Sequence, residues 1–197
     1  KERYVLDNKN PEIVFTQGYS ATNTFYDQMS YFCICTFGGS EDLISLYNRF
    51  EEQQIKDLRL DAFFEVIGDE QYKMSKVGEK VYDCFVIRSA ELYLNKAEAE
   101  AMLDKVEAIQ TIKTLLHNRF EGGIPDVDGL SGKDLVSFIR DERRRELCFE
   151  AHRWFDLRRY AVSPKYPEKK SIRHTAYDIK GKLEGDYVLK PYGEDPA

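Results

Sequence analysis

The chain has 197 residues, 42% of them hydrophobic, which is enough to bury a substantial core in one domain. The 29 Lys and Arg against 35 Asp and Glu give a net charge of −6, which argues against a nucleic-acid-binding surface. No run of residues approaches the roughly 18 consecutive apolar residues of a membrane-spanning helix, so no membrane span is predicted.

Residues 1–80 are rich in aromatic side chains and loops, and they contain one helical pattern. Ser40 can cap this helix, which continues with apolar residues at helical spacing: Leu43, Leu46, Tyr47 and Phe50. Short strands are expected at residues 12–15 and 60–67. This region therefore predicts irregular structure around a single helix.

A helical hairpin is the clearest unit in the middle of the chain. Residues 88–103 favour a helix, and the alanines on one face of it allow a second helix to approach closely. After a tight turn at residues 104–105, apolar residues recur at helical spacing as far as Phe120, before Gly122 and Gly123. Two antiparallel helices that cross at small residues are typical of tetratricopeptide-like repeats, although the sequence pattern of that repeat fits poorly.

One hairpin cannot bury its own apolar face, so we expect the next helix to pack against it. Ser131 and Asp134 form a capping-box-like start for that helix, and an apolar stripe comes next: Leu135, Phe138 and Ile139. At about 100° per residue, a helical wheel places charged residues within the same stripe: Glu142, Glu146, Glu150 and Arg153.

A carboxylate on a buried face requires a hydrogen-bonded partner, and Arg is the residue best suited to provide one. We therefore predict a structural ionic network formed by five residues: Glu142, Glu146, Glu150, Arg145 and Arg153. A solvated charged face is the alternative, because charge runs usually lie in water. The dense alternation of aromatic and charged residues between Phe149 and Tyr160 favours burial.

A catalytic pair formed by Glu142 and Glu146 is disfavoured, because the nearby arginines should keep both carboxylates ionised. The three histidines lie far apart, and no HExxH or paired CxxC motif occurs, so neither a metal site nor a cofactor is predicted. The four cysteines allow three pairings, and their spacing selects none. Trp154, the only tryptophan, is assigned to packing beside an arginine.

Three segments share the order and spacing of one family signature. Residues 142–160, ERRRELCFEAHRWFDLRRY, are similar to an ERRRELAFEGHRWFDLRR-like stretch, with Cys148 and Ala151 where Ala and Gly are usual. The missing Gly disfavours a sharp helix break at this point. Residues 86–99 are similar to an RLAEVYLIYAEA segment, and residues 187–191 to a YLFPIP-type strand. Together they resemble the SusD/RagB family of outer-membrane nutrient-binding lipoproteins of Bacteroidetes.

The resemblance implies a mainly α fold, with tetratricopeptide-like helical hairpins in an α/α superhelix, long irregular loops and a few short β-strands. Residues 1–197 would form one C-terminal domain fragment of a longer protein, which would carry the secretion signal and the lipidated Cys. Within it, the loop- and aromatic-rich region covers residues 1–80. The hairpin and the signature helix cover residues 81–162, and an extended tail covers residues 163–197.

The resemblance also implies capture without catalysis of a glycan, or of another nutrient polymer, on the cell surface. Its delivery to a SusC-like TonB-dependent transporter would come next, with the full-length protein lipid-anchored in the outer membrane. Aromatic rings would stack on sugar rings, and the candidates are Tyr19, Phe25, Tyr26, Tyr31 and Tyr47. Most aromatic residues serve packing instead. Two alternatives are a helical-repeat protein-interaction scaffold and a glycoside hydrolase with two carboxylates in an open cleft.

Overall fold

The computed structural model describes residues 5–6, 10–17, 38–67, 71–76, 85–178, 180 and 182–194. The chain divides into an N-terminal unit, Lys1–Glu150, and a C-terminal unit, Ala151–Ala197. Within the described ranges, six α-helices are accompanied by short strands that pair two by two. The predicted mainly α composition is therefore confirmed.

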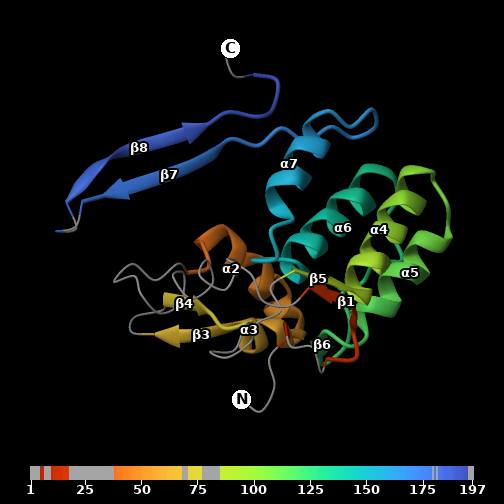
Figure 1. The fold of residues 1–197 in the computed structure, drawn as a ribbon. Coiled ribbons are helices and arrows are strands. Elements are labelled where there is room, and N and C mark those ends of the chain that lie inside the picture. Colours follow the sequence, from red (N-terminus) through yellow and green to blue (C-terminus); the bar gives the residue numbers. More distant parts are fainter. Residues whose placement is uncertain are drawn as a thin grey trace. The chain divides into compact units, whose positions relative to one another are not determined.

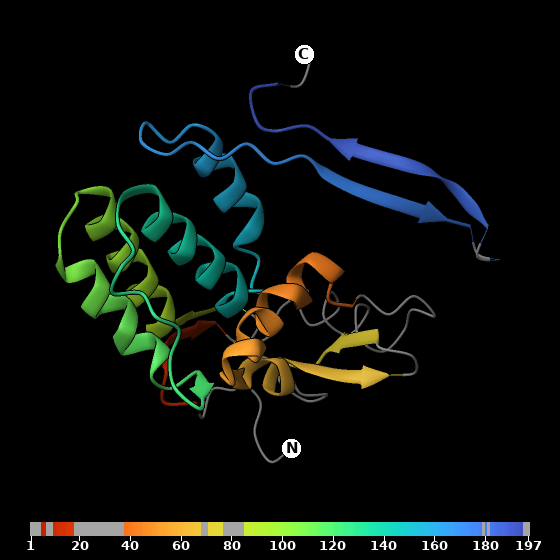
Figure 2. The same ribbon diagram turned by 180° about the vertical axis from the view of Figure 1, so that it is seen from behind.

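Three helices of the N-terminal unit pack side by side: α4 (Ser89–Met102), α5 (Glu107–Leu116) and α6 (Gly132–Glu146). Figures 1 and 2 show α4 next to both of the others. The predicted small-residue face of α4 is buried, with Ala97 fully inaccessible, and α5 contributes larger side chains such as the fully buried Ile112. The hairpin is thus confirmed, and it forms because small residues on one helix leave room for branched residues on the next.

The second helix of the hairpin is shorter than predicted, because α5 ends at Leu116 rather than near Phe120. Phe120 lies instead in β6 (Phe120–Glu121), which pairs antiparallel with β2 (Lys56–Asp57). Gly122 comes directly after this strand with a φ of +84°, and an added Cβ would lie 2.3 Å from the carbonyl oxygen of Gln54. Only glycine fits this backbone approach.

Two further strand pairs lie in the N-terminal unit. β1 (Ile13–Gln17) pairs antiparallel with β5 (Phe85–Arg88), so the strand predicted near residues 12–15 is present. β3 (Phe64–Ile67) pairs antiparallel with β4 (Gln71–Met74). The first pair also places two charged residues together, because Ile13 lies opposite Arg88 and brings the neighbouring Glu12 close to that side chain.

Between β1 and β3 the chain forms α2 (Glu41–Tyr47), the 3-10 helix η2 (Asn48–Gln53) and α3 (Leu58–Phe63). The α2 helix confirms the helix expected after Ser40. The strand predicted at residues 60–67 is wrong for its first half, where α3 continues to Phe63. Asp57 begins this helix, because its side chain accepts a hydrogen bond of 3.0 Å from the backbone N–H of Arg59.

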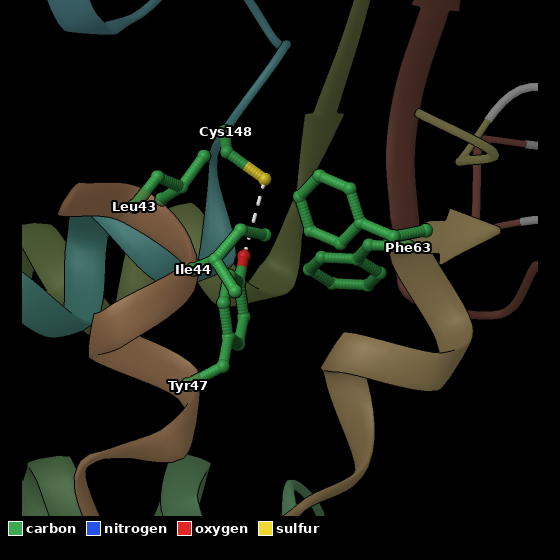
Figure 3. Packing of buried hydrophobic residues seen from close by; sticks show 6 residues of the cluster. Leu43, Ile44, Tyr47, Phe63 and Cys148 are labelled. Atoms are coloured by element: carbon green, nitrogen blue, oxygen red, sulfur yellow. Dashed lines mark hydrogen bonds between the residues drawn. The ribbon is translucent and has the colours of Figure 1, made fainter. Parts of the chain in front are cut away.

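One apolar cluster joins α2 and α3 to the chain immediately after α6 (Figure 3), and its members are Leu43, Ile44, Tyr47, Phe63, Phe64 and Cys148. The hydroxyl of Tyr47 donates to the carbonyl oxygen of Arg145 at 2.6 Å. The Tyr47 hydroxyl oxygen also lies 3.3 Å from the sulfur of Cys148. Because a hydroxyl carries one hydrogen, the thiol is the donor in this second contact.

The helical wheel assumed one continuous helix beyond Glu146, and this prediction is wrong, because α6 ends at that residue. Phe149 and Ala151 take left-handed conformations, with φ of 61° and 63°, and a separate helix, α7 (Arg153–Ala161), begins after them. The helix therefore breaks here even though Ala replaces the usual Gly. Cβ strain makes a left-handed alanine unfavourable, so the surrounding contacts must hold this turn.

In the C-terminal unit, α7 precedes an antiparallel hairpin of β7 (Ile172–Tyr177) and β8 (Leu183–Leu189), shown in Figure 1. Ile172 lies opposite Leu189 at its open end. Across the two strands, the carboxylate of Asp186 accepts hydrogen bonds from Arg173 and Thr175. Among the residues that the structure describes, none of the helices combines the length and the apolarity needed to cross a membrane.

Candidate functional site

Four charged residues of the signature, Glu142, Arg145, Glu146 and Glu150, lie in a buried group that we call the ionic cluster. It contains five basic and five acidic residues joined by ion pairs: Arg59, Lys76, Arg88, Arg119, Arg145, Glu12, Asp57, Glu142, Glu146 and Glu150. The formal charges cancel within the group. Burial of charge is tolerated only when each ion is paired and hydrogen-bonded, and this balance meets that condition.

Glu146 lies at the centre of the ionic cluster and is 1% exposed. Its carboxylate accepts hydrogen bonds from Arg59 at 3.0 Å, from Arg88 at 2.9 Å and from Nε of Arg119 at 2.9 Å. Burial alone would raise the pKa of Glu146, but the charges of these three guanidinium groups hold it well below its usual value. The residue is therefore a fixed anion.

Glu142, one turn earlier on α6, is fully buried and accepts from Arg59 and from Nε of Arg145 at 3.0 Å. Burial raises the pKa of Glu142, and the two arginines outweigh it, so the pKa lies below its usual value. Arg59 also donates to Asp57 through Nε at 2.8 Å and Nη2 at 2.7 Å. Neither Glu142 nor Glu146 has a proton to give at neutral pH, so neither can act as a general acid.

Lys76 fixes the turn after α6. Its fully buried Nζ donates to the carbonyl oxygens of Glu146 at 2.8 Å and Cys148 at 2.9 Å, and also to the Glu150 carboxylate. The last carbonyls of a helix lack partners within it, and Lys76 supplies them here. Nζ also lies 4.1 Å from the centre of the Phe63 ring, in a cation–π contact.

Glu150 completes the ionic cluster from the turn rather than from the helix. It accepts from Nε of Arg88 at 2.9 Å and pairs with Lys76. Burial raises the pKa of Glu150, but the charges of Lys76 and Arg88 outweigh this effect, so the pKa lies below its usual value. The turn thus returns a carboxylate to the same group that Glu142 and Glu146 enter from α6.

The structure brings together four of the five residues proposed for the network: Glu142, Glu146, Glu150 and Arg145. Arg153 belongs instead to the C-terminal unit. The wheel could not identify the partners from other segments, which are Glu12, Asp57, Arg59, Lys76, Arg88 and Arg119. One signal was present: Arg88 falls inside the second signature segment, immediately before α4.

Four of the five aromatic residues proposed to stack on sugars lie outside the described residues: Tyr19, Phe25, Tyr26 and Tyr31. Tyr47 is 1% exposed, so its ring has no free face, and its proposed role in ligand binding is wrong. Its position at helical spacing after Leu43 explains the burial, because both side chains face the apolar cluster of Figure 3.

The C-terminal unit contains a hollow of about 460 Å³ beside α7 and the open end of the hairpin. We call it the aromatic hollow, and its polar and aromatic lining consists of Trp154, Arg158, Lys170, Lys190 and Tyr192. Trp154 is 47% and Tyr192 is 50% exposed. The guanidinium carbon of Arg158 lies 4.3 Å from the Tyr192 ring centre and 5.9 Å from that of Trp154.

Trp154 is thus stacked with an arginine, as expected, but about half of its surface remains exposed, so packing alone does not describe it. Sequence reasoning missed the aromatic hollow because its lining comes from three separate segments. Among the residues that the structure describes, no group of three or more His, Cys, Asp or Glu side chains could hold a metal ion.

Comparison with known proteins identifies the family. Residues 58–187 match the SusD family, so the chain belongs to it, and the predicted resemblance is confirmed. The chain is similar to SusD-like protein P38 of Formosa agariphila, with 35% identity over 113 residues. That match covers 53% of this chain and 21% of that protein.

Two solved structures share the fold. A SusD-like carbohydrate binding protein from Bacteroides vulgatus is similar with a TM-score of 0.61 and 19% identity, over 95% of this chain and 42% of that one. A SusD-like protein from Bacteroides fragilis has a TM-score of 0.53 and 18% identity, over 93% and 49% of the two chains. The chain thus spans less than half the length of each of these three relatives.

Proposed function

We propose that the chain is part of a surface protein that captures a glycan without catalysis and delivers it to a SusC-like TonB-dependent transporter. The full-length protein would be lipid-anchored in the outer membrane. The observation that carries this proposal is the match of residues 58–187 to the SusD family, whose members bind carbohydrate and are not enzymes.

The ionic cluster supports the non-catalytic part of the proposal. Glycoside hydrolysis needs two carboxyl groups in an open cleft, one of them with a raised pKa. The signature carboxylates Glu142 and Glu146 are instead buried, and their pKa values are lowered. They join α6 to α3 and β5, so their role is to hold a scaffold together.

The helical part would extend a tetratricopeptide-like superhelix. The antiparallel pair α4 and α5, with α6 packed on α4, is the arrangement that stacked helical hairpins repeat. Such stacks present extended surfaces to large ligands, which suits the capture of a polymer. A protein ligand would be an alternative use of the same surface, and no contact among the described residues favours it.

Calorimetric titration of the 197-residue chain with a panel of polysaccharides tests the proposal, combined with an assay for released reducing sugar. We expect heat of binding for at least one glycan and no release of reducing ends. Cleavage that disappears in Glu142→Gln or Glu146→Gln would contradict the proposal, and so would failure of every polysaccharide in the panel to bind. Delivery is tested in the producing cells, where loss of the protein should abolish uptake of the bound glycan.

A further inference from the structure

The C-terminal unit has the opposite charge to the rest of the chain. Residues 151–197 contain ten Lys and Arg against seven Asp and Glu, a net charge of +3, whereas the whole chain carries −6. Residues 1–150 therefore carry −9. A segregated positive charge in an acidic protein favours a negatively charged ligand at that unit.

Strand pairing concentrates part of this charge at the aromatic hollow. Ile172 lies opposite Leu189 at the open end of the hairpin, so Lys170, just before β7, and Lys190, just after β8, come to the same place. Arg158 reaches it from α7. Among the described residues that line the hollow, three are basic and none is acidic.

Three acidic groups of the unit pair with basic residues outside the lining. Asp156 accepts from Arg159 at 2.9 Å, and Glu194 pairs with Lys169 at 2.7 Å. Asp186 pairs with Arg173 across the hairpin. None of these three pairs uses a basic residue of the lining.

The hollow also offers the surfaces that bind sugar rings. Trp154 and Tyr192 are each about half exposed, and the Arg158 side chain contacts both rings. Aromatic faces bind the apolar face of a sugar, while guanidinium and ammonium groups bind sulfate or carboxylate oxygens through charge-assisted hydrogen bonds. We propose that the aromatic hollow binds an anionic sugar, sulfated or carboxylated, within the captured glycan. This inference rests on the proposed function and names the class of ligand.

The single tryptophan of the chain makes the test specific, because its fluorescence reports on the hollow itself. The probes are a sulfated galactan tetrasaccharide, an alginate tetrasaccharide that carries only carboxylates, and cellotetraose, which is neutral. We expect a saturable change in Trp154 emission with at least one anionic probe and none with cellotetraose. Comparison of the two anionic probes distinguishes sulfate from carboxylate recognition, and added salt should weaken either.

The test variant is the double substitution Lys170→Gln and Lys190→Gln, at two exposed positions. The matched control is Lys180→Gln and Lys182→Gln, which removes the same charge from exposed residues of the same unit outside the lining. The test variant should bind roughly tenfold more weakly, because each exposed charge contact contributes a factor of about three. The control should stay within about twofold.

Equal weakening in both variants would overturn the proposal, because it would indicate general attraction between charges. The same emission change with cellotetraose would also overturn it. If calorimetry detects glycan binding while Trp154 emission stays constant, the glycan binds elsewhere, so this proposal fails and the proposed function stands. If calorimetry detects no binding of any glycan, the proposed function fails as well.

Discussion

Replacing Glu146 by Ala removes the carboxylate to which Arg59, Arg88 and Arg119 donate. Arg59 keeps its pairs with Asp57 and Glu142, and Arg88 keeps its pair with Glu150. Within the part of the chain that the structure describes, Arg119 would retain one carboxylate partner, Glu12, whose side chain is 33% exposed. The substitution therefore leaves buried positive charge only partly compensated and opens a cavity at the centre of the ionic cluster.

Loss of one partner from a buried ion pair typically costs about 3–5 kcal/mol, and we expect a decrease of that size in the free energy of unfolding. For a protein of this length, it corresponds to a fall in melting temperature of about 6–20 °C. Urea unfolding monitored by far-ultraviolet circular dichroism measures the change, because most helices, including α4 to α6, belong to the N-terminal unit. The variant Glu146→Gln, which keeps the volume, separates the loss of charge from the cavity.

Asp141→Ala is the matched control on the same helix. Asp141 pairs with Arg49 at 2.9 Å, but their side chains are 36% and 47% exposed, so the loss should stay below about 1 kcal/mol. A decrease for Glu146→Ala no larger than that of the control would refute the buried ionic cluster as a stabilising element.

Three further predictions concern the signature region. The folded state lowers the pKa of the carboxyl groups of Glu142, Glu146 and Glu150. The free energy of unfolding should therefore be constant near neutral pH and fall as the pH drops below about 4.3. A midpoint for acid unfolding above about pH 6 would contradict this direction of the pKa shifts. Ala151→Gly should stabilise the chain by about 0.5–1 kcal/mol in urea unfolding, because Ala151 has a φ of 63°. The control Ala99→Gly, within α4, should destabilise it by about 1 kcal/mol. A decrease in the free energy of unfolding for both variants would contradict the left-handed turn. Lys76→Met should lower the melting temperature by several degrees, because the Cys148 carbonyl oxygen loses this donor and the Glu150 carboxylate loses one of its cationic partners. An unchanged melting temperature would show that Lys76 does not hold the turn.

Local patterns in the sequence predicted the helices that repeat one periodicity. Small residues on α4 and branched residues on α5 indicated the hairpin, and Glu142 and Glu146, four residues apart, indicated a charged buried face on α6. These predictions hold because a helix places residues three and four apart on one side. The same rule places Tyr47 on the buried face of its helix, together with Leu43, and the structure buries it there. The assignment of Tyr47 as a sugar-stacking residue did not take this spacing into account.

Two features could not be predicted from periodicity. The turn after α6 depends on left-handed conformations at Phe149 and Ala151, and neither residue type signals such a conformation. The partners of Glu146 come from segments that are distant in the sequence, with Arg59 87 residues away and Arg88 58 residues away. Only the strand pairing and the helix packing of the folded chain bring these side chains together.

The ionisation state of the carboxyl groups of Glu142 and Glu146 tests most directly whether the signature forms a scaffold rather than a reactive site. Carbon-13 NMR of glutamate-labelled protein can monitor each side-chain carboxyl as the pH is lowered. We predict that the signals of Glu142 and Glu146, like that of Glu150, stay ionised through the range near pH ~4.3 where exposed glutamates titrate, for as long as the chain remains folded. A buried carboxyl that takes up its proton above about pH 5 would instead be poised for proton transfer, and would contradict a purely structural role.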